Sequence, residues 1–120
     1  MLKRIAVLVS GGGTNLQALI DAQKSDIITS GEITLVISNN PDAYALERAK
    51  NAGINTVVVN KKECADQTEF EKKLVLALEE NRTDFIVLAG FMCILSESFT
   101  KKYANRIINV HPSLIPSFCG

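Results

Sequence analysis

Short, uninterrupted apolar runs alternate along the chain with longer stretches in which apolar residues recur every three or four positions. The uninterrupted runs predict five strands, at residues 5–9, 32–37, 56–59, 85–88 and 107–110. The periodic stretches predict four helices, at residues 15–24, 43–51, 69–80 and 96–103. A strand without polar alternation is buried on both faces, as in a parallel sheet covered by helices. The pattern therefore predicts an α/β fold with a Rossmann-like, doubly wound, mostly parallel sheet.

The composition narrows the classes of function. The chain has 13 Lys+Arg and 13 Asp+Glu, so its formal net charge is zero. A protein that binds the phosphates of a nucleic acid needs an excess of basic residues, and so does one that binds a membrane through a polybasic anchor. The zero net charge argues against both classes. The longest apolar run, residues 85–95, is shorter than the roughly 20 residues of a membrane span, and the run at 5–9 is shorter than a signal-peptide core of about 7 residues. We therefore expect one cytoplasmic domain with neither nucleic acid nor membrane as a partner.

The cysteines and the histidine give no metal-ligand pattern. Cys64, Cys93 and Cys119 are far apart in the sequence, and His111 is the sole histidine. Zinc sites and disulfide frameworks both require closer or paired spacing. We expect free thiols and no metal.

A glycine-rich segment, residues 10–15, lies between the first predicted strand and the first predicted helix. Consecutive glycines let the backbone approach a ligand closely, and a helix N-terminus offers free N–H groups and a partial positive charge. This predicts a phosphate site at Gly12, Gly13, Thr14 and Asn15. The alternative is a tight turn with Thr14 as the helix N-cap, which needs fewer glycines.

A dinucleotide site is a weaker interpretation of the same segment. The dinucleotide-binding motif is Gly-x-Gly-x-x-Gly, and its first two glycines are present at Gly11 and Gly13, but Leu16 stands at the third. Residues 38–40 are Ser-Asn-Asn, where Asp or Glu would hold a ribose. The segment is not a Walker A loop, because no Gly-Lys-Ser/Thr follows. The expected ligand is smaller than NAD.

Two further strand ends carry unusual residues. Apolar residues continue past the fourth predicted strand to Leu95. Packing beneath the next helix, with Ser96 as its N-cap, is the favoured interpretation, and an apolar wall for a flat, ring-bearing ligand is the alternative.

At the fifth strand, Asn109 and His111 are two positions apart and face the same way in an extended chain. An amide donor beside an imidazole suits a developing oxyanion and a proton transfer.

Several segments together resemble the folate-dependent formyltransferases. They are residues 10–17 (SGGGTNLQ), 38–40 (SNN), 88–92 (LAGFM), 94–95 (IL) and 109–116 (NVHPSLIP). The likeness runs from residue 5 to the last residue. It implies the formyltransferase fold.

The resemblance also implies an activity. The amine of glycinamide ribonucleotide would attack the formyl carbon of the co-substrate 10-formyltetrahydrofolate in purine synthesis, with no metal. The ribonucleotide phosphate would lie on the glycine loop. The folate would lie against five residues, Met92, Cys93, Ile94, Leu95 and Gln67. Protonated His111 would stabilise the tetrahedral oxyanion and protonate the leaving folate nitrogen, while Asn109 would hydrogen-bond the same oxygen.

The sequence departs from the family pattern at two of these positions. Cys93 stands where many relatives carry Arg, and Gln67 stands where relatives carry a basic residue. The family's catalytic Asp, which raises the pKa of the histidine, is expected beyond Pro116. We therefore expect residues 1–120 to be the N-terminal portion of a single formyltransferase domain, poorly active alone and prone to associate through an open sheet edge. A homodimer is left open.

Several alternatives remain. A formyltetrahydrofolate hydrolase would carry an N-terminal regulatory domain before the glycine loop, and a methionyl-tRNA formyltransferase would carry a basic extension. Outside the family, the alternatives are a non-catalytic phosphate-ligand-binding module and a dinucleotide-binding oxidoreductase.

Overall fold

The computed structural model describes residues 3–24, 31–93 and 95–110. In that part of the chain five parallel strands form one sheet in the order β3-β2-β1-β4-β5. The strands are β1 (Lys3–Val9), β2 (Gly31–Ser38), β3 (Asn55–Val58), β4 (Phe85–Ala89) and β5 (Ile107–Val110). The predicted parallel α/β sheet is confirmed.

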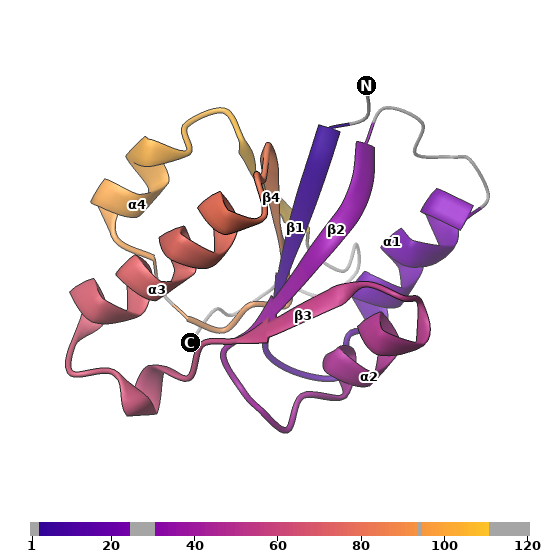
Figure 1. Cartoon of the computed structure of the whole chain (residues 1–120), viewed down its shortest axis with the longest axis horizontal. Helices are drawn as coiled ribbons and strands as arrows, with labels where there is room; N and C mark the ends of the chain where they lie inside the picture. The colour runs from indigo at the N-terminus through magenta and orange to yellow at the C-terminus, as the bar shows by residue number, and fades with distance from the viewer. Residues whose placement is uncertain (1–2, 25–30, 94, 111–120) are drawn as a thin grey trace.

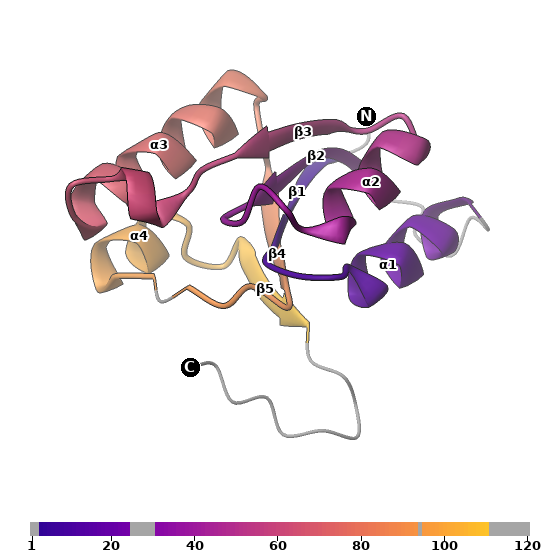
Figure 2. The ribbon, with the colours of Figure 1, turned by 90° about the horizontal axis from the view of Figure 1, so that it is seen from below.

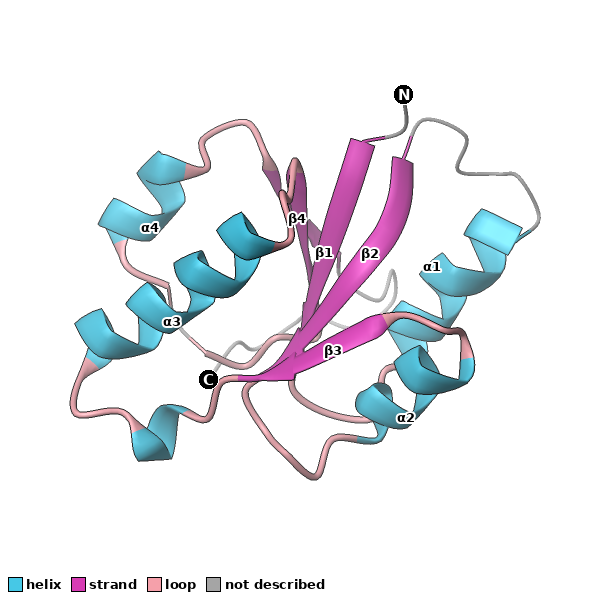
Figure 3. Ribbon diagram, viewed as in Figure 1, coloured by secondary structure: helices cyan, strands magenta, loops and turns pink. Residues whose placement is uncertain are grey.

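Helices cover both faces of the sheet (Figures 1 and 3). Helices α1 (Thr14–Lys24) and α2 (Tyr44–Asn51) lie on one face. Helices α3 (Gln67–Glu80) and α4 (Glu97–Lys102) lie on the other, with the short 3-10 helix η1 (Lys61–Glu63) before α3. The view from below shows the three layers, with the sheet between the two helix pairs (Figure 2). In the described ranges, no helix has the length and apolar character needed to cross a membrane.

Strand β1 shows why the strands lack polar alternation. Four successive residues, Ala6, Val7, Leu8 and Val9, are all 0% exposed. Ala6 and Leu8 pack in the core beneath α3 and α4, whereas Val7 and Val9 pack in the core beneath α1 and α2. Side chains alternate between the two faces of a strand, so a strand covered on both faces must be apolar throughout.

The central helix α3 is formed by the predicted apolar stripe. Phe70, Leu74 and Leu78 recur every four residues and are 0–1% exposed against the sheet. Burying each of these side chains stabilises the fold by about 1.5–3 kcal/mol. The helix begins two residues earlier than predicted because the carboxylate of Asp66 caps it, accepting the N–H of Glu69 at 2.9 Å.

The boundaries of β5 agree with the prediction, and those of the other elements differ from it by at most two residues. Ala43 precedes α2 as its N-cap and Ser96 precedes α4 as its N-cap, the latter as predicted. Strand β3 ends at Val58, and Val59 follows it buried beneath α3. Backbone hydrogen bonding sets such boundaries, and an apolar pattern locates them only approximately.

The strand order creates a switch point between β1 and β4. From β1 the chain winds outward through β2 to β3, and it then returns to the other side of β1 to form β4 and β5. In an open parallel sheet, ligands bind beyond the carboxyl ends of the strands at such a point. The loops after β1 and β4 therefore lie side by side at the place where a ligand site is expected.

Candidate active site

The loop after β1 is held against the start of α2. Gly13 has a left-handed backbone with φ +79°, and a Cβ built on it would lie 2.6 Å from Cβ of Ala45. Any larger residue would be strained there and would collide with α2. By contrast, a Cβ on Gly11 or Gly12 would meet nothing within 4 Å. The fold requires glycine at position 13, whereas positions 11 and 12 face open space and leave room for a ligand.

The same loop leads directly into α1. The helix begins at Thr14, and the carbonyl of Gly13 accepts the N–H of Gln17 at 2.8 Å. Gly13 therefore occupies the N-cap position, and the alternative in which Thr14 caps the helix is wrong. The first turn of α1 contains no acidic residue. Its free N–H groups and the helix dipole favour an anion next to Gly12, Gly13, Thr14 and Asn15.

Helix α2 supplies two hydrogen bonds that fix the glycine loop. The N–H of Ala45 donates to the carbonyl of Gly11 at 3.1 Å. Nε of Arg48 donates to the carbonyl of Gly12 at 2.7 Å, and its Nη1 donates to Oε1 of Gln17 at 3.4 Å. These bonds turn two loop carbonyls toward α2. Sequence reasoning missed Arg48, because nothing in its local pattern sets it apart from the other exposed charges of an amphipathic helix.

The loop after β4 divides its apolar residues between core and surface. Phe91 is 6% exposed, and Cys93 and Leu95 pack against the same core, as the favoured interpretation predicts. Met92 points outward and is 61% exposed. The alternative of an apolar wall for a ligand stays a prediction, with Met92 as the exposed side chain available for it. Ile94, which was expected to contact the folate, lies outside the described residues.

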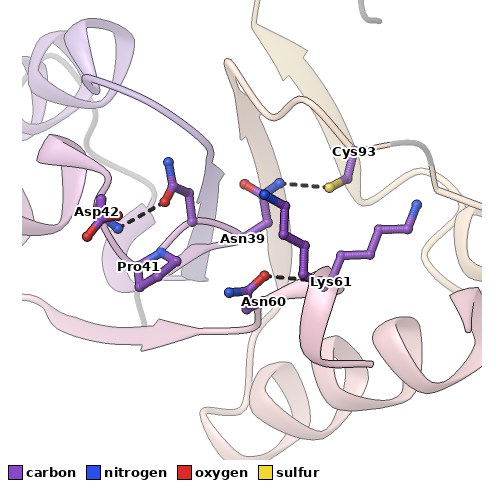
Figure 4. Close-up of a pocket in the computed structure, with 8 residues that line it drawn as sticks. Asn39, Pro41, Asp42, Asn60, Lys61 and Cys93 are labelled. Carbon is purple, nitrogen blue, oxygen red and sulfur yellow. Dashed lines mark hydrogen bonds between the residues drawn. The ribbon is translucent and has the colours of Figure 1, made fainter. Parts of the chain in front are cut away.

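Two hydrogen bonds join this loop to the loops after β1 and β2. The N–H of Met92 donates to Oγ of Ser10 at 2.7 Å. Nδ2 of Asn39 donates to Sγ of Cys93 at 2.8 Å (Figure 4). The carboxyl ends of three strands are thus tied together across the switch point. Cys93 and Cys64 are free thiols, as expected, whereas Cys119 lies outside the described residues.

The loops after β2 and β3 enclose an open cavity of about 530 Å³ (Figure 4). Most of the residues that line it are of polar or cationic type, among them Asn39, Asn40, Asn60, Lys61 and Lys62, and Cys93 also lines it. Oδ1 of Asn60 accepts the N–H of Lys62 at 3.0 Å and so caps η1. The lining contains one carboxylate, Asp42, and the two lysines. The cavity therefore suits an uncharged polar or anionic part of a ligand.

The residues after β2 build their own turn. Oγ of Ser38 donates to the carbonyl of Asn40 at 2.7 Å and accepts its N–H at 3.0 Å. Oδ1 of Asn40 accepts the N–H of Asp42 at 3.0 Å. Ser38 is fully buried, so it has no access to a ribose. This arrangement agrees with the prediction that the strand end lacks the acid of a dinucleotide site.

A buried carboxylate anchors the far end of the loop after β4. Glu71 in α3 accepts the N–H of Ser96 at 2.6 Å and the hydroxyl of Ser96 at 2.5 Å. It also accepts a hydrogen bond from Nε2 of Gln67 at 2.7 Å. Burial alone would raise the pKa of Glu71, but the hydrogen bonds from Ser96 and Gln67, together with the charge of Lys61, outweigh burial and lower it. Sequence reasoning gave Gln67 a role toward the folate and overlooked Glu71, whose position inside an apolar stripe was its only signal.

The last described strand carries the remaining site residue. Asn109 pairs in register with Leu88 of β4, and its side chain is exposed at the carboxyl end of the edge strand β5. His111, its expected partner, lies outside the described residues. In the described part of the chain, no three His, Cys, Asp or Glu side chains gather as a metal ion would need.

Comparison with known proteins gives a consistent set of matches. A sequence model of the formyl transferase family matches residues 3–120. The phosphoribosylglycinamide formyltransferase of Haemophilus influenzae is 46% identical over 119 residues, which are 99% of this chain and 56% of that protein. The human trifunctional purine biosynthetic protein adenosine-3 is 47% identical over 117 residues, 98% of this chain and 12% of that protein. The chain thus spans about half the length, or less, of these curated relatives.

Solved structures agree with the sequence matches. The phosphoribosylglycinamide formyltransferase of Coxiella burnetii superposes with a TM-score of 0.88 at 43% identity, covering 98% of this chain and 55% of that one. The enzyme of the same name from Brucella melitensis superposes with a TM-score of 0.90 at 39% identity, covering 100% and 62%. The fold is therefore the one these proteins share.

Proposed function

The chain belongs to the formyl transferase family, and on this premise we propose that it carries the substrate-binding edge of an enzyme that formylates glycinamide ribonucleotide with 10-formyltetrahydrofolate. The relatives at 44–46% identity that are named phosphoribosylglycinamide formyltransferase support this acceptor. We further propose that residues 1–120 are the N-terminal portion of a single formyltransferase domain.

The ribonucleotide phosphate binds at the glycine loop. The loop leaves open space at Gly11 and Gly12, and the N-terminus of α1 supplies free N–H groups without a competing acid. Arg48 turns the carbonyl of Gly12 toward α2, so that carbonyl does not repel the phosphate. This arrangement is the single observation that carries the proposal, because open space and free N–H groups at the sheet's switch point favour an anion.

The folate lies against the loop after β4. Met92 offers an exposed apolar surface next to the glycine loop, to which its own N–H is bonded through Ser10. Two bound substrates on these loops meet at the ends of β1 and β4, so the amine and the formyl carbon are brought together there. Cys93, Ile94, Leu95 and Gln67 complete the residues proposed to shape this half of the site.

The chemistry requires a donor where negative charge develops. As the amine nitrogen forms its bond to the formyl carbon, the carbonyl oxygen becomes an oxyanion. Asn109, exposed at the end of β5, donates its amide N–H groups to that oxygen. When the intermediate collapses, the bond from the formyl carbon to the folate nitrogen breaks, and His111 gives that nitrogen a proton. The attacking amine nitrogen, which is cationic after attack, loses one proton to solvent, so the product is a neutral formamide.

The direct test is product formation from the two proposed substrates. The whole protein of which residues 1–120 are proposed to be the N-terminal portion is incubated with glycinamide ribonucleotide and 10-formyltetrahydrofolate, and the formylated ribonucleotide is measured by mass spectrometry. A matched reaction without the ribonucleotide measures release of formate. Formate release without an acceptor would favour the hydrolase, and substrate binding without either product would favour the non-catalytic binding module.

A further inference from the structure

A second cavity lies at the opposite end of the sheet, where α3 and α4 end and β4 and β5 begin. Its volume is about 310 Å³. Its polar and aromatic lining residues are Glu79, Arg82, Thr83, Lys102, Tyr103 and Arg106. None of these residues takes part in the site described above.

The charges around this cavity are unbalanced. Arg82, Lys102 and Arg106 contribute three cations against the single carboxylate of Glu79. Oε2 of Glu79 lies 3.9 Å from Nζ of Lys102, at the outer limit of an ion pair. Within the described ranges neither arginine has a carboxylate partner. A concentration of positive charge in a chain of zero net charge favours an anionic ligand.

Two hydroxyl groups at this cavity have no hydrogen-bond partner. Tyr103 is 5% exposed, and neither its hydroxyl nor Oγ1 of Thr83 bonds to any described residue. Buried polar atoms in native proteins are nearly always paired, so each exception calls for an absent partner. Burial raises the pKa of Tyr103, and the charge of Glu79 raises it further, against the opposing effect of Arg106. The phenol therefore remains protonated at neutral pH and is available as a donor.

We propose that this cavity is a binding site for a phosphate monoester. The guanidinium groups of Arg82 and Arg106 match the geometry of phosphate oxygens, and the two hydroxyls supply further donors. Arg106 and Lys102 lie over the Tyr103 ring at 5.5 and 5.9 Å from its centre. The volume admits one phosphate on a small carrier such as a sugar, and it is too small for a nucleic-acid strand.

The test locates binding at this cavity separately from the glycine loop. The isotope-labelled protein is titrated with ribose 5-phosphate and, in a second arm, with inorganic phosphate at constant ionic strength, while backbone amide shifts are followed by NMR. We expect saturable shifts at Thr83 and Arg106, and binding of ribose 5-phosphate several-fold tighter than that of inorganic phosphate. Shifts confined to the glycine loop would overturn the site, and equal affinity for the two probes would overturn its assignment to a monoester.

Variants separate a ligand site from a structural role. Replacing both arginines (R82Q with R106Q) is expected to weaken binding by about tenfold or more. Lys101→Gln removes an exposed charge of α4 that pairs with Glu97 and does not line the cavity, so it should leave affinity unchanged. An equal loss of affinity in the double arginine variant and in Lys101→Gln would mean that the overall positive charge attracts the phosphate. That result would contradict the proposal.

The Tyr103 hydroxyl gives a test that does not depend on removing charge. Tyr103→Phe deletes an unpaired buried hydroxyl, so without phosphate it should raise the melting temperature. The same change should weaken ribose 5-phosphate binding. Tyr44→Phe, at a tyrosine that is 57% exposed, is the control and should do neither. Lower stability of Tyr103→Phe without phosphate, or unchanged affinity with it, would contradict the proposal.

Discussion

The hydroxyl of Ser10 accepts the N–H of Met92 at 2.7 Å and so joins two loops that are 82 residues apart in the sequence. The first of these loops is the proposed phosphate site, and the second is the proposed folate site. Because β1 and β4 are neighbours at the switch point, this single bond links the two proposed substrate sites.

The first prediction concerns this bond. Ser10→Ala leaves the N–H of Met92 without its partner, at a cost of about 0.5–1.5 kcal/mol. We expect KM to rise for both substrates, because each loop loses a contact that fixes the other. Ser98→Ala, at an exposed serine of α4, is the control. Steady-state kinetics with each substrate varied in turn measure the two KM values. A rise in KM for the ribonucleotide alone would show that the loops are not coupled.

A second prediction separates two adjacent glycines. Gly13→Ala forces an L residue into φ +79° and places a methyl group 2.6 Å from Ala45. Backbone strain alone is worth about 1–2 kcal/mol, so the melting temperature should fall clearly. Gly12→Ala meets no atom within 4 Å. It should leave the melting temperature nearly unchanged and raise KM for the ribonucleotide, because the methyl group occupies the space proposed for the phosphate. Comparable losses of stability in the two variants would contradict this division.

A third prediction concerns Arg48. Removing its side chain (R48A) frees the carbonyl of Gly12 to point toward the proposed phosphate. We expect KM for the ribonucleotide to rise by about tenfold while kcat changes little, because binding is lost equally in the ground and transition states. Lys50→Ala, at an exposed position of the same helix, controls for the loss of a positive charge. If Lys50→Ala has the same effect, long-range charge rather than loop geometry is responsible.

A fourth prediction is a pH dependence set by Glu71. Its pKa is lowered in the folded protein, so the carboxylate contributes stability above its unfolded pKa of about 4.3 and loses it as the pH falls through the lower folded pKa. Glu71→Gln should lower the free energy of unfolding at pH 7 by about 1.5–3 kcal/mol, because Ser96 loses a charged acceptor.

Urea unfolding at several pH values measures this effect. The gap in unfolding free energy between the parent protein and Glu71→Gln should narrow as the pH falls below about 4.3. Glu80→Gln, at an exposed position near the end of α3, should show no such gap at any pH. A gap that stayed constant down to acid pH would mean that packing, and not the charge of Glu71, holds Ser96.

Apolar pattern alone predicted the strands and the α-helices of this fold, for a clear physical reason, but not the 3-10 helix η1. A strand covered by helices on both faces, such as β1, must be apolar at every position, and a helix on a sheet, such as α3, needs a stripe like Phe70, Leu74 and Leu78. Such requirements are local and appear directly in the sequence. The order of the strands depends on which chain segments pair, and no local pattern encodes it.

The features of the proposed site that could be predicted from the sequence are those that depend on backbone chemistry. Glycines before a helix indicated an anion site, and their different roles appeared only when Ala45 was seen against Gly13. The contacts of Arg48, Asn39 and Glu71 join residues that are remote in sequence and unremarkable in type. Such contacts follow from tertiary packing and were beyond prediction.

The central claim is that the carboxyl end of this sheet performs formyl transfer, with Asn109 stabilising the oxyanion. The most direct measurement is kcat for formylation of glycinamide ribonucleotide by Asn109→Ala and Asn109→Asp, with both substrates saturating. Loss of one such donor typically lowers kcat by about 10²–10³-fold. Because the side chain is exposed, the melting temperature should not change. We predict a fall in kcat of this size in both variants. A kcat equal to that of the parent protein would contradict the account.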